Sequence, residues 1–140
     1  MSLQIRVLGA GDEMLLAEAV GMIEEADLTP QRAAAHLADP DLVNVVAIAD
    51  GGIVGFVYGH VLRRFEAVSF FIYSVDVAET HRRRGVGRAM LERLKALAPE
   101  RGWDEMFVFT NRSNPAAMRL YASAGGVSPP PDDVVMFDFD

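Results

Sequence analysis

Apolar residues along this chain follow two different spacings, and the changes between them outline the predicted elements. Runs rich in Val, Ile and Phe predict strands, whereas apolar positions three or four residues apart predict amphipathic helices. The predicted strands cover residues 4–8, 42–49, 53–62, 69–77, 105–110 and 134–139, and the predicted helices follow Asp12, Thr29, the Gly85 turn and Asn114. The element order is β-α-α-β-β-β-α-β-α-β, which indicates a mixed α/β (α+β) sandwich.

Glycines mark two further features of the predicted sheet. Asp50, Gly51 and Gly52 form a strong hairpin signal between the second and third strands. Gly55 and Gly59 interrupt the third strand, which indicates a β-bulge or a close approach of another backbone.

The stretch 70–97 joins an apolar strand to an amphipathic helix through a short basic turn. The strand ends near Val77, and the helix opens with the sequence Arg-Arg-Arg-Gly-Val-Gly at residues 82–87. Backbone N–H groups in the first turn of a helix lack intrahelical partners, and the helix dipole places positive charge there. Glycines let an oxygen approach this backbone, and arginines add full charges. The stretch therefore predicts a site for a ligand that carries a pyrophosphate.

Composition narrows the class of protein. The chain has 140 residues, 51% of them hydrophobic, which predicts one domain over residues 1–140. No apolar run reaches the roughly 18 residues of a membrane span, no signal peptide is visible at the N-terminus, and cysteine is absent. We therefore expect a cytoplasmic protein without disulfides. The net charge of -7 argues against a nucleic-acid partner, and the arginine cluster suits a small anion.

A second motif follows about 30 residues later, where Asn114 and Pro115 open a helix that carries Tyr121 and ends at Gly125. Together with the Arg-x-x-Gly-x-Gly turn, it resembles the GNAT superfamily of acetyl-CoA-dependent N-acetyltransferases. The resemblance implies a mixed, mostly antiparallel sheet of six to seven strands with about four helices, and acetyl-CoA as co-substrate. It also implies that the strand ending at Val77 splays from its neighbour.

The family pattern assigns roles to residues of this chain. It implies that Tyr121 protonates the leaving thiolate as a general acid and that Asn114 contacts the cofactor arm. Backbone groups from Val75 to Val77 would line the thioester. The resemblance, with the basic turn, gives a set of cofactor-binding residues: Val75, Val77, Arg82, Arg83, Arg84, Gly85, Val86, Gly87, Arg88 and Asn114.

A closer likeness is to type I aminoglycoside 3-N-acetyltransferases. The similar segments are Val61-Leu62, Phe65-Glu66, Ile72-Tyr73, His81-Arg82-Arg83 and the ending Phe137-Asp138-Phe139-Asp140. Phe71 and Ser74 stand where this likeness leads us to expect acidic residues. The expected reaction is acetyl transfer to a primary amine of a small cationic acceptor, with an aminoglycoside and a related amine both open.

Several polar residues are candidates for the acceptor side. Asp76 is the first candidate for the general base, although a structural carboxylate at a strand end explains it equally well. Simple pleating places Tyr73 on the face of Val75 unless a bulge intervenes. Ser74, Glu66 and Asp138 are further candidates for substrate binding.

The sequence leaves other functions open. An acetyltransferase that acts on a peptide or protein, and an acyl-CoA sensor without catalysis, both fit the cofactor motifs. His36, His60 and His81 show no metal-ligand spacing, so we expect no metal. The family resemblance also suggests a homodimer through the last strands.

Overall fold

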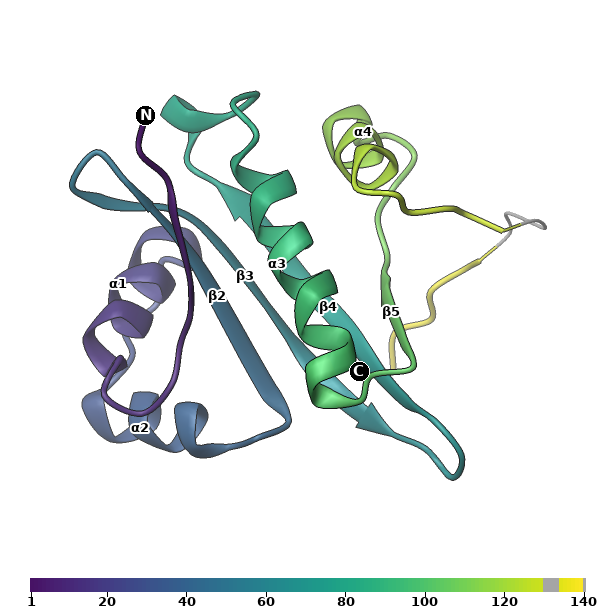
Figure 1. The fold of residues 1–140 in the computed structure, drawn as a ribbon, viewed down its shortest axis with the longest axis horizontal. Coiled ribbons are helices and arrows are strands. Elements are labelled where there is room, and N and C mark those ends of the chain that lie inside the picture. The colour runs from purple at the N-terminus through teal and green to yellow at the C-terminus, as the bar shows by residue number, and fades with distance from the viewer. Residues whose placement is uncertain (130–133, 140) are drawn as a thin grey trace.

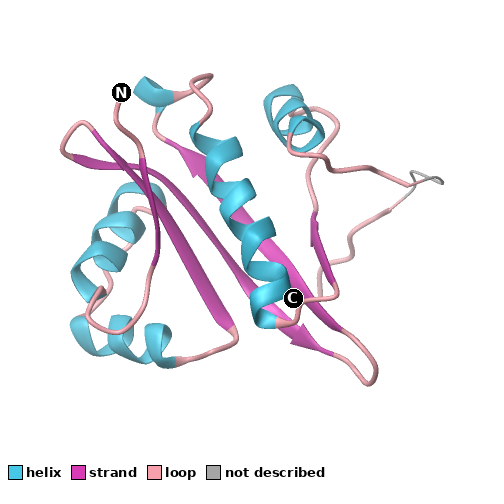
Figure 2. Cartoon of the chain, in the orientation of Figure 1, coloured by secondary structure: helices cyan, strands magenta, loops and turns pink. Residues whose placement is uncertain are grey.

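The computed structural model describes residues 1–129 and 134–139 and contains a mixed five-stranded sheet in this part of the chain (Figures 1 and 2). The strands are β1 (Gln4–Val7), β2 (Leu42–Ala49), β3 (Gly52–Arg63), β4 (Val68–Val77) and β5 (Glu105–Val108), in that spatial order. The helices are α1 (Glu13–Ile23), α2 (Pro30–Ala38), α3 (Val86–Arg101) and α4 (Pro115–Ser123), with a 3-10 turn at Glu79–His81. Neighbouring strands are antiparallel except for the parallel pair β4–β5.

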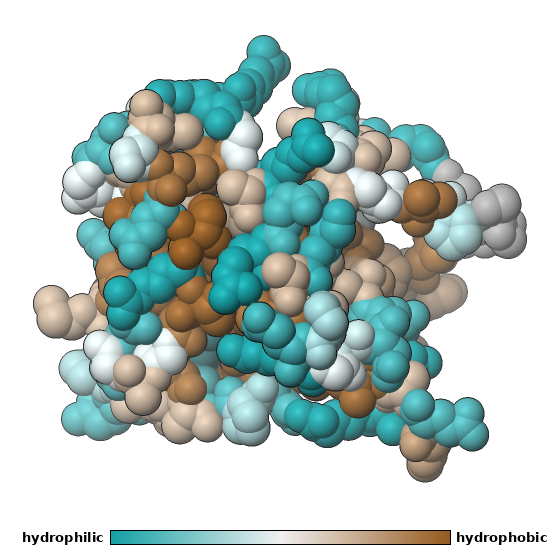
Figure 3. Space-filling model, viewed as in Figure 1, coloured by the Kyte–Doolittle hydropathy of each residue, from teal (hydrophilic) through white to brown (hydrophobic). Residues whose placement is uncertain are grey.

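Helices cover both faces of this sheet. On one face, α3 packs on strand residues such as Val57 and Phe70 through Met90 and Leu94, and Trp103 completes this cluster. On the other face, α1 and α2 bury a smaller cluster. In Figure 1, α3 lies in front of the strands, with α1 and α2 behind them. Figure 3 shows hydrophilic side chains over the outer surface of α3, as its amphipathic pattern predicts.

Local signals account for most helix ends. The Thr29 hydroxyl accepts a hydrogen bond from the Arg32 N–H, which caps α2, and Gly102 ends α3 in a left-handed conformation. Asp12 precedes α1 as expected. Its carboxylate, however, accepts hydrogen bonds from the Gly9 N–H and from Arg6 instead of capping the helix.

The close backbone approach predicted for β3 is confirmed at Gly59, which lies beside a bulge in β4. Tyr58 pairs with Ser74 and Gly59 pairs with Ile72, so that Tyr73 is the extra residue on β4. A Cβ atom at Gly59 would lie 2.2 Å from the Phe71 carbonyl oxygen, which leaves room for glycine alone. The bulge places Tyr73 on the opposite face from Val75, so simple pleating does not hold here.

Two parts of the predicted fold are wrong. Residues 134–139 form no strand, and the described sheet has five strands instead of six to seven. The alternating pattern of this segment favours a strand. A strand must pair with a neighbouring strand, however, and this segment pairs with no strand of the described sheet. Its apolar side chains stay exposed: Val134, Val135, Met136, Phe137 and Phe139. None of the helices in the described ranges is long and apolar enough to cross a membrane.

Candidate active site

The candidate site begins where β4 and β5 separate. Their pairing ends with Ile72 and Val108, but β4 continues to Val77, and Figure 1 shows the two strands diverging toward α4. The Ala78 N–H donates to Val54 on the β3 side. Because backbone groups alternate in direction along a strand, those of Val75 and Val77 point into the gap between β4 and β5. The splayed strand is thus present.

The start of α3 forms one wall of this gap. Arg83 and Gly85 have positive φ angles of 61° and 83°, which turn the chain sharply into the helix. The Ala89 N–H donates the hydrogen bond to Gly85 that closes the first turn, at 2.9 Å. The N–H groups of the residues from Val86 to Arg88 therefore precede the helical ladder and can bind an anion.

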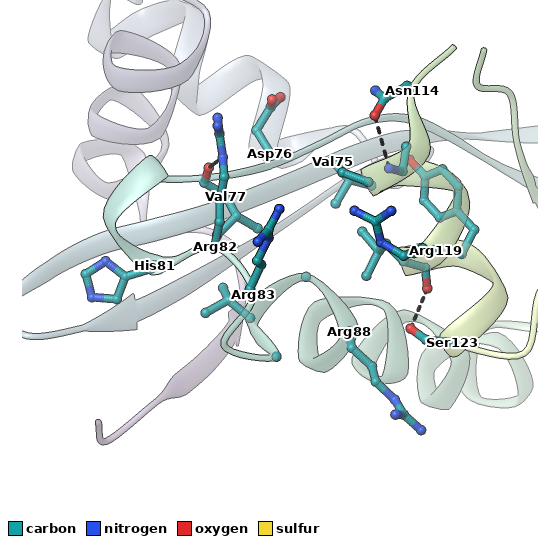
Figure 4. A pocket seen from close by; sticks show the side chains of 17 residues that line it. Val75, Asp76, Val77, His81, Arg82, Arg83, Arg88, Asn114, Arg119 and Ser123 are labelled. Atoms are coloured by element: carbon teal, nitrogen blue, oxygen red, sulfur yellow. Dashed lines mark hydrogen bonds between the residues drawn. The ribbon is translucent and has the colours of Figure 1, made fainter. Parts of the chain in front are cut away.

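The arginines of the turn are arranged differently from one another (Figure 4). The Arg82 Nε donates to the Val77 carbonyl oxygen at 3.1 Å, which ties the turn to the end of β4. Arg83 extends into the space between the turn and α4, and Arg119 approaches it from α4. Arg88 extends away from this space, and Arg84 does not line it. Arg83 and Arg119 are thus the arginines best placed to contact a bound phosphate.

A histidine supports the turn from outside. His81 Nε2 lies 2.7 Å from Asp50 Oδ2, and Thr80 Oγ1 lies 2.8 Å from His81 Nδ1. The hydrogen bond from His81 lowers the pKa of Asp50. Because Asp50 belongs to the β2–β3 hairpin, this pair fastens the basic turn to the sheet. A supporting role for His81 agrees with its position just before the arginines.

Helix α4 forms the other wall and approaches α3 closely. A Cβ atom at Gly87 would lie 3.0 Å from Leu120, so Gly87 allows the two helices to meet. The Asn114 Oδ1 accepts a hydrogen bond from the Ala117 N–H at 3.1 Å and caps α4 (Figure 4). Tyr121 is half-buried on the next turns of this helix. Burial, and secondly the charge of Asp76, raise the pKa of its phenol.

The basic turn, the end of β4 and helix α4 line an open cleft of about 1080 Å³. Of the residues predicted to bind cofactor or to catalyse, it brings together Val75, Asp76, Val77, Arg82, Arg83, Gly85, Val86, Gly87, Arg88, Asn114 and Tyr121. Arg119 and Ser123 also line it and were not predicted as site residues. Their signal was present, because both lie on the same helix as Tyr121. In the described residues, no group of three or more His, Asp or Glu side chains could hold a metal ion.

The acceptor candidates lie in several places. The Ser74 hydroxyl donates to the Asp76 carboxylate at 2.7 Å beside the cleft, and Tyr73 stacks on Tyr58 with ring centroids 5.5 Å apart. Glu66 lies at the tip of the β3–β4 hairpin, at the opposite end of β4 from Val77. Asp138 is exposed in the C-terminal segment. The structure therefore brings Tyr73, Ser74 and Asp76 together and leaves Glu66 apart from them.

Tyr58 was not predicted as a site residue, although it faces the same side of the sheet as Tyr73. Its hydroxyl donates to Glu24 Oε1 at 3.0 Å, which links α1 to β3. Burial and then this hydrogen bond raise the pKa of Tyr58 far above its usual range. No local motif marks Tyr58 or Glu24, because only the folded sheet brings them together.

Comparison with known proteins identifies the class of this fold and cleft. Residues 12–125 match the model of the acetyltransferase (GNAT) family, and the chain belongs to that family. A curated relative, L-2,4-diaminobutyric acid acetyltransferase from Nocardia farcinica (strain IFM 10152), is 34% identical over 79 residues. This match covers 56% of the present chain and only 40% of that relative's length.

Solved structures of aminoglycoside acetyltransferases are similar over their whole length. One from an uncultured soil metagenomic sample is 29% identical, with a TM-score of 0.82 and coverage of 100% of this chain and 99% of that one. Another, also from a soil metagenome and in complex with sisomicin, has a TM-score of 0.87 at 20% identity and covers 99% and 95% of the two chains. The aminoglycoside N-acetyltransferase AAC(6')-Iy in complex with CoA shares the fold at 16% identity, with a TM-score of 0.79 and coverage of 99% and 95%.

Proposed function

We propose that residues 1–140 form a single N-acetyltransferase domain that transfers the acetyl group of acetyl-CoA to a primary amine of a small cationic acceptor. The observation that carries this proposal is that three features line one cleft. The N–H groups at the start of α3 that have no intrahelical partner lie beside the free edge of β4, and Tyr121 of α4 lines the same cleft. These three features support a pyrophosphate site, a path for the pantetheine arm and a proton donor next to one another.

The pyrophosphate would lie on the N–H groups between Val86 and Arg88, with Arg83 and Arg119 adding positive charge. The pantetheine arm would run along the free edge of β4 toward Val75. Asn114 keeps its side-chain nitrogen for this arm, because its oxygen caps α4. The match between a long, open cleft and a long, anionic ligand supports acetyl-CoA as co-substrate, which supplies the activated acetyl thioester.

Residues of the chain would then assist direct attack of the acceptor amine on the thioester carbonyl. The acceptor nitrogen is nucleophilic only after its ammonium proton has left, and Asp76 is the proposed base. A backbone N–H of the β4 edge would stabilise the negative charge that develops on the carbonyl oxygen. As the carbon–nitrogen bond forms and the carbon–sulfur bond breaks, Tyr121 would donate its proton to the sulfur. Its raised pKa keeps the phenol protonated at neutral pH.

A thiol-release assay with acetyl-CoA over a panel of primary amines tests this function. We expect acetyl-CoA to bind and free CoA to appear only when a suitable amine is present. Binding of acetyl-CoA without transfer to any amine or peptide would favour the acyl-CoA sensor. Transfer restricted to peptide amines would favour a protein N-acetyltransferase.

Aminoglycosides are the second candidate acceptors. Similarity to the aminoglycoside acetyltransferase that shares 29% identity favours them, and the same panel should therefore include sisomicin. We also propose a homodimer, in which the exposed C-terminal segment supplies the contact.

A further inference from the structure

Five aromatic side chains form a continuous row across the face of the sheet opposite α3. Tyr58 on β3 stacks on Tyr73 of β4 at 5.5 Å, and Tyr73 meets Phe71 edge-on at 6.1 Å. Phe71 stacks on Phe107 of β5 at 5.2 Å, and Phe109 contacts both of these phenyl rings. We call these five residues the aromatic row.

The aromatic row extends from the edge of the hydrophobic core to the surface. Tyr58 packs against the smaller core cluster, and Phe71 and Phe107 are partly buried. Tyr73 is 61% exposed and Phe109 is 64% exposed, whereas core aromatics such as Phe56 and Phe70 are buried. The bulge in β4 is what turns Tyr73 outward to this face. A cluster of neighbouring aromatic side chains that reaches the surface in this way is a candidate binding surface.

The row leads directly to the proposed reaction centre. Ser74 follows Tyr73 and holds the Asp76 carboxylate, which lines the cleft. Asp76 and Tyr121 line the same cleft, and the pKa of Tyr121 is raised chiefly by burial and secondly by the charge of Asp76. The side chains of Val75 and Val77 lie on the other face of β4, where they pack against the core, whereas Ser74 and Asp76 are hydrogen-bonded to each other next to Tyr73. An acceptor therefore reaches Asp76 from the face that carries the row.

An acceptor that approaches Asp76 from this face meets an aromatic surface with carboxylates at one end. Asp76 lies at that end, and Glu24 is hydrogen-bonded to Tyr58 beside it. Phe71 and Ser74 contribute a ring and a hydroxyl where the closer family likeness leads us to expect carboxylates. Aromatic rings attract cations over their faces and stack on other rings. This arrangement suits one ammonium group and one apolar ring better than several ammonium groups.

We propose that the aromatic row binds the body of the acceptor, and that the preferred acceptor is an arylalkyl primary amine with a single ammonium group. The proposal rests on the acetyl-transfer function proposed above. The ammonium group would lie at Asp76, and the aromatic ring would lie on Tyr73 and Phe71. The row thus determines specificity, whereas the cofactor side of the cleft does not.

The experiment compares phenethylamine with ethylamine, which lacks the ring, and with sisomicin, which carries several amines. Thiol release with acetyl-CoA is measured for the wild type and for Tyr73→Ala, with Phe109→Ala as a second variant. The matched control is Phe65→Ala, because Phe65 is a fully exposed phenylalanine at the hairpin tip, outside the row.

We expect kcat/KM for phenethylamine to exceed that for ethylamine by about tenfold, since stacking of the added ring on the row has that magnitude, and to exceed that for sisomicin. Tyr73→Ala should raise the KM for phenethylamine about tenfold with the KM for acetyl-CoA unchanged. Phe65→Ala should change neither KM.

Preference for ethylamine or sisomicin, or an unchanged KM in both row variants, would overturn the proposal while acetyl transfer itself stands. A row variant that changes the sedimentation coefficient but not the KM would show that a second protein molecule, not the acceptor, covers the row, and would also overturn the proposal.

If no amine is acetylated at all, the proposed function fails. Calorimetry with phenethylamine and CoA then shows whether the row binds the ring, and equal heats for wild type and Tyr73→Ala would also dismiss the row as a binding site.

Discussion

Asp76 connects the two sides of the candidate site at the scale of single residues. Its carboxylate accepts a hydrogen bond from Ser74, the neighbour of Tyr73, and lines the same cleft as Tyr121. A base beside the acceptor and an acid beside the sulfur are what amine acetylation needs. The predictions at this scale concern Tyr121 and the arginines.

Replacing Tyr121 by Phe should lower kcat about 10²-fold, because proton donation to the leaving sulfur is lost. The ring remains, so the affinity for acetyl-CoA measured by calorimetry should stay within about twofold. Steady-state kinetics with a reactive amine checks this. An unchanged kcat would remove Tyr121 from the mechanism.

The ionisation of Tyr121 gives a pH prediction. Its pKa is raised above the ordinary value of 10.0, so the folded protein holds the proton more tightly than the unfolded chain. The stability that this contributes is complete below pH 10 and is lost as pH rises through the higher folded pKa. An ultraviolet difference titration of wild type against Tyr121→Phe should show a phenol that ionises above pH 10. A midpoint at or below 10 would contradict the buried position.

Arg83 and Arg84 are neighbours in the sequence but differ in position, which makes them a matched pair. Arg83→Ala should raise the KM for acetyl-CoA about tenfold, since a charge-assisted contact with phosphate is lost. Arg84→Ala should leave it nearly unchanged, because Arg84 does not line the cleft. Equal effects of the two substitutions would mean that the cluster acts only through its total charge.

The sequence largely predicted which residues lie at the site. It did not predict which way their side chains point. The arginine and glycine turn and the Asn114–Tyr121 motif lie in short stretches of sequence, so a linear pattern identifies them. Arg119 was missed because a lone arginine on a helix is usually a solvated residue. Whether an arginine points into the cleft depends on local φ angles and on the packing of α3 against α4.

At the scale of elements, the bulge between β3 and β4 is the feature on which the acceptor side depends. It turns Tyr73 toward Tyr58 and leaves no room for a side chain at Gly59. The two glycines in β3 indicated an irregular strand in the sequence. They did not indicate which residue of β4 the bulge would turn outward, because that depends on the register of the partner strand.

Gly59→Ala should therefore destabilise the protein by about 3 kcal/mol, at the upper end of the usual cost of overpacking. The added Cβ would meet the Phe71 carbonyl oxygen at 2.2 Å. Gly52→Ala is the matched control in the same strand, since a Cβ atom there meets nothing within 4 Å. Chemical denaturation measures both variants, and similar free energies of unfolding would contradict the close approach.

At the scale of the whole molecule, the segment 134–139 is notable because it carries several exposed apolar side chains and forms no strand. Its apolar side chains face solvent, and no strand of the described sheet pairs with the outer edge of β5. Exposed apolar segments with high β-propensity and a free sheet edge both promote association.

We therefore expect the protein to sediment as a dimer. The double substitution of Val135 and Phe137 by Asp should shift it toward the monomer, because charges oppose burial of this segment. Phe65→Asp, at an even more exposed site elsewhere, should not shift it. A wild-type protein that sediments as a monomer at micromolar concentration would refute the dimer.

The sequence by itself determined the element order from β1 to α4, the position of the basic turn at the start of α3 and the family to which the chain belongs. These features depend on periodicity and on short motifs, which local residue patterns encode. The tertiary structure decided the outward turn of Tyr73, the juxtaposition of Tyr58, Glu24 and Asp76, and the unpaired state of residues 134–139. These depend on strand register and on contacts between distant residues, which the order of the residues along the chain does not display.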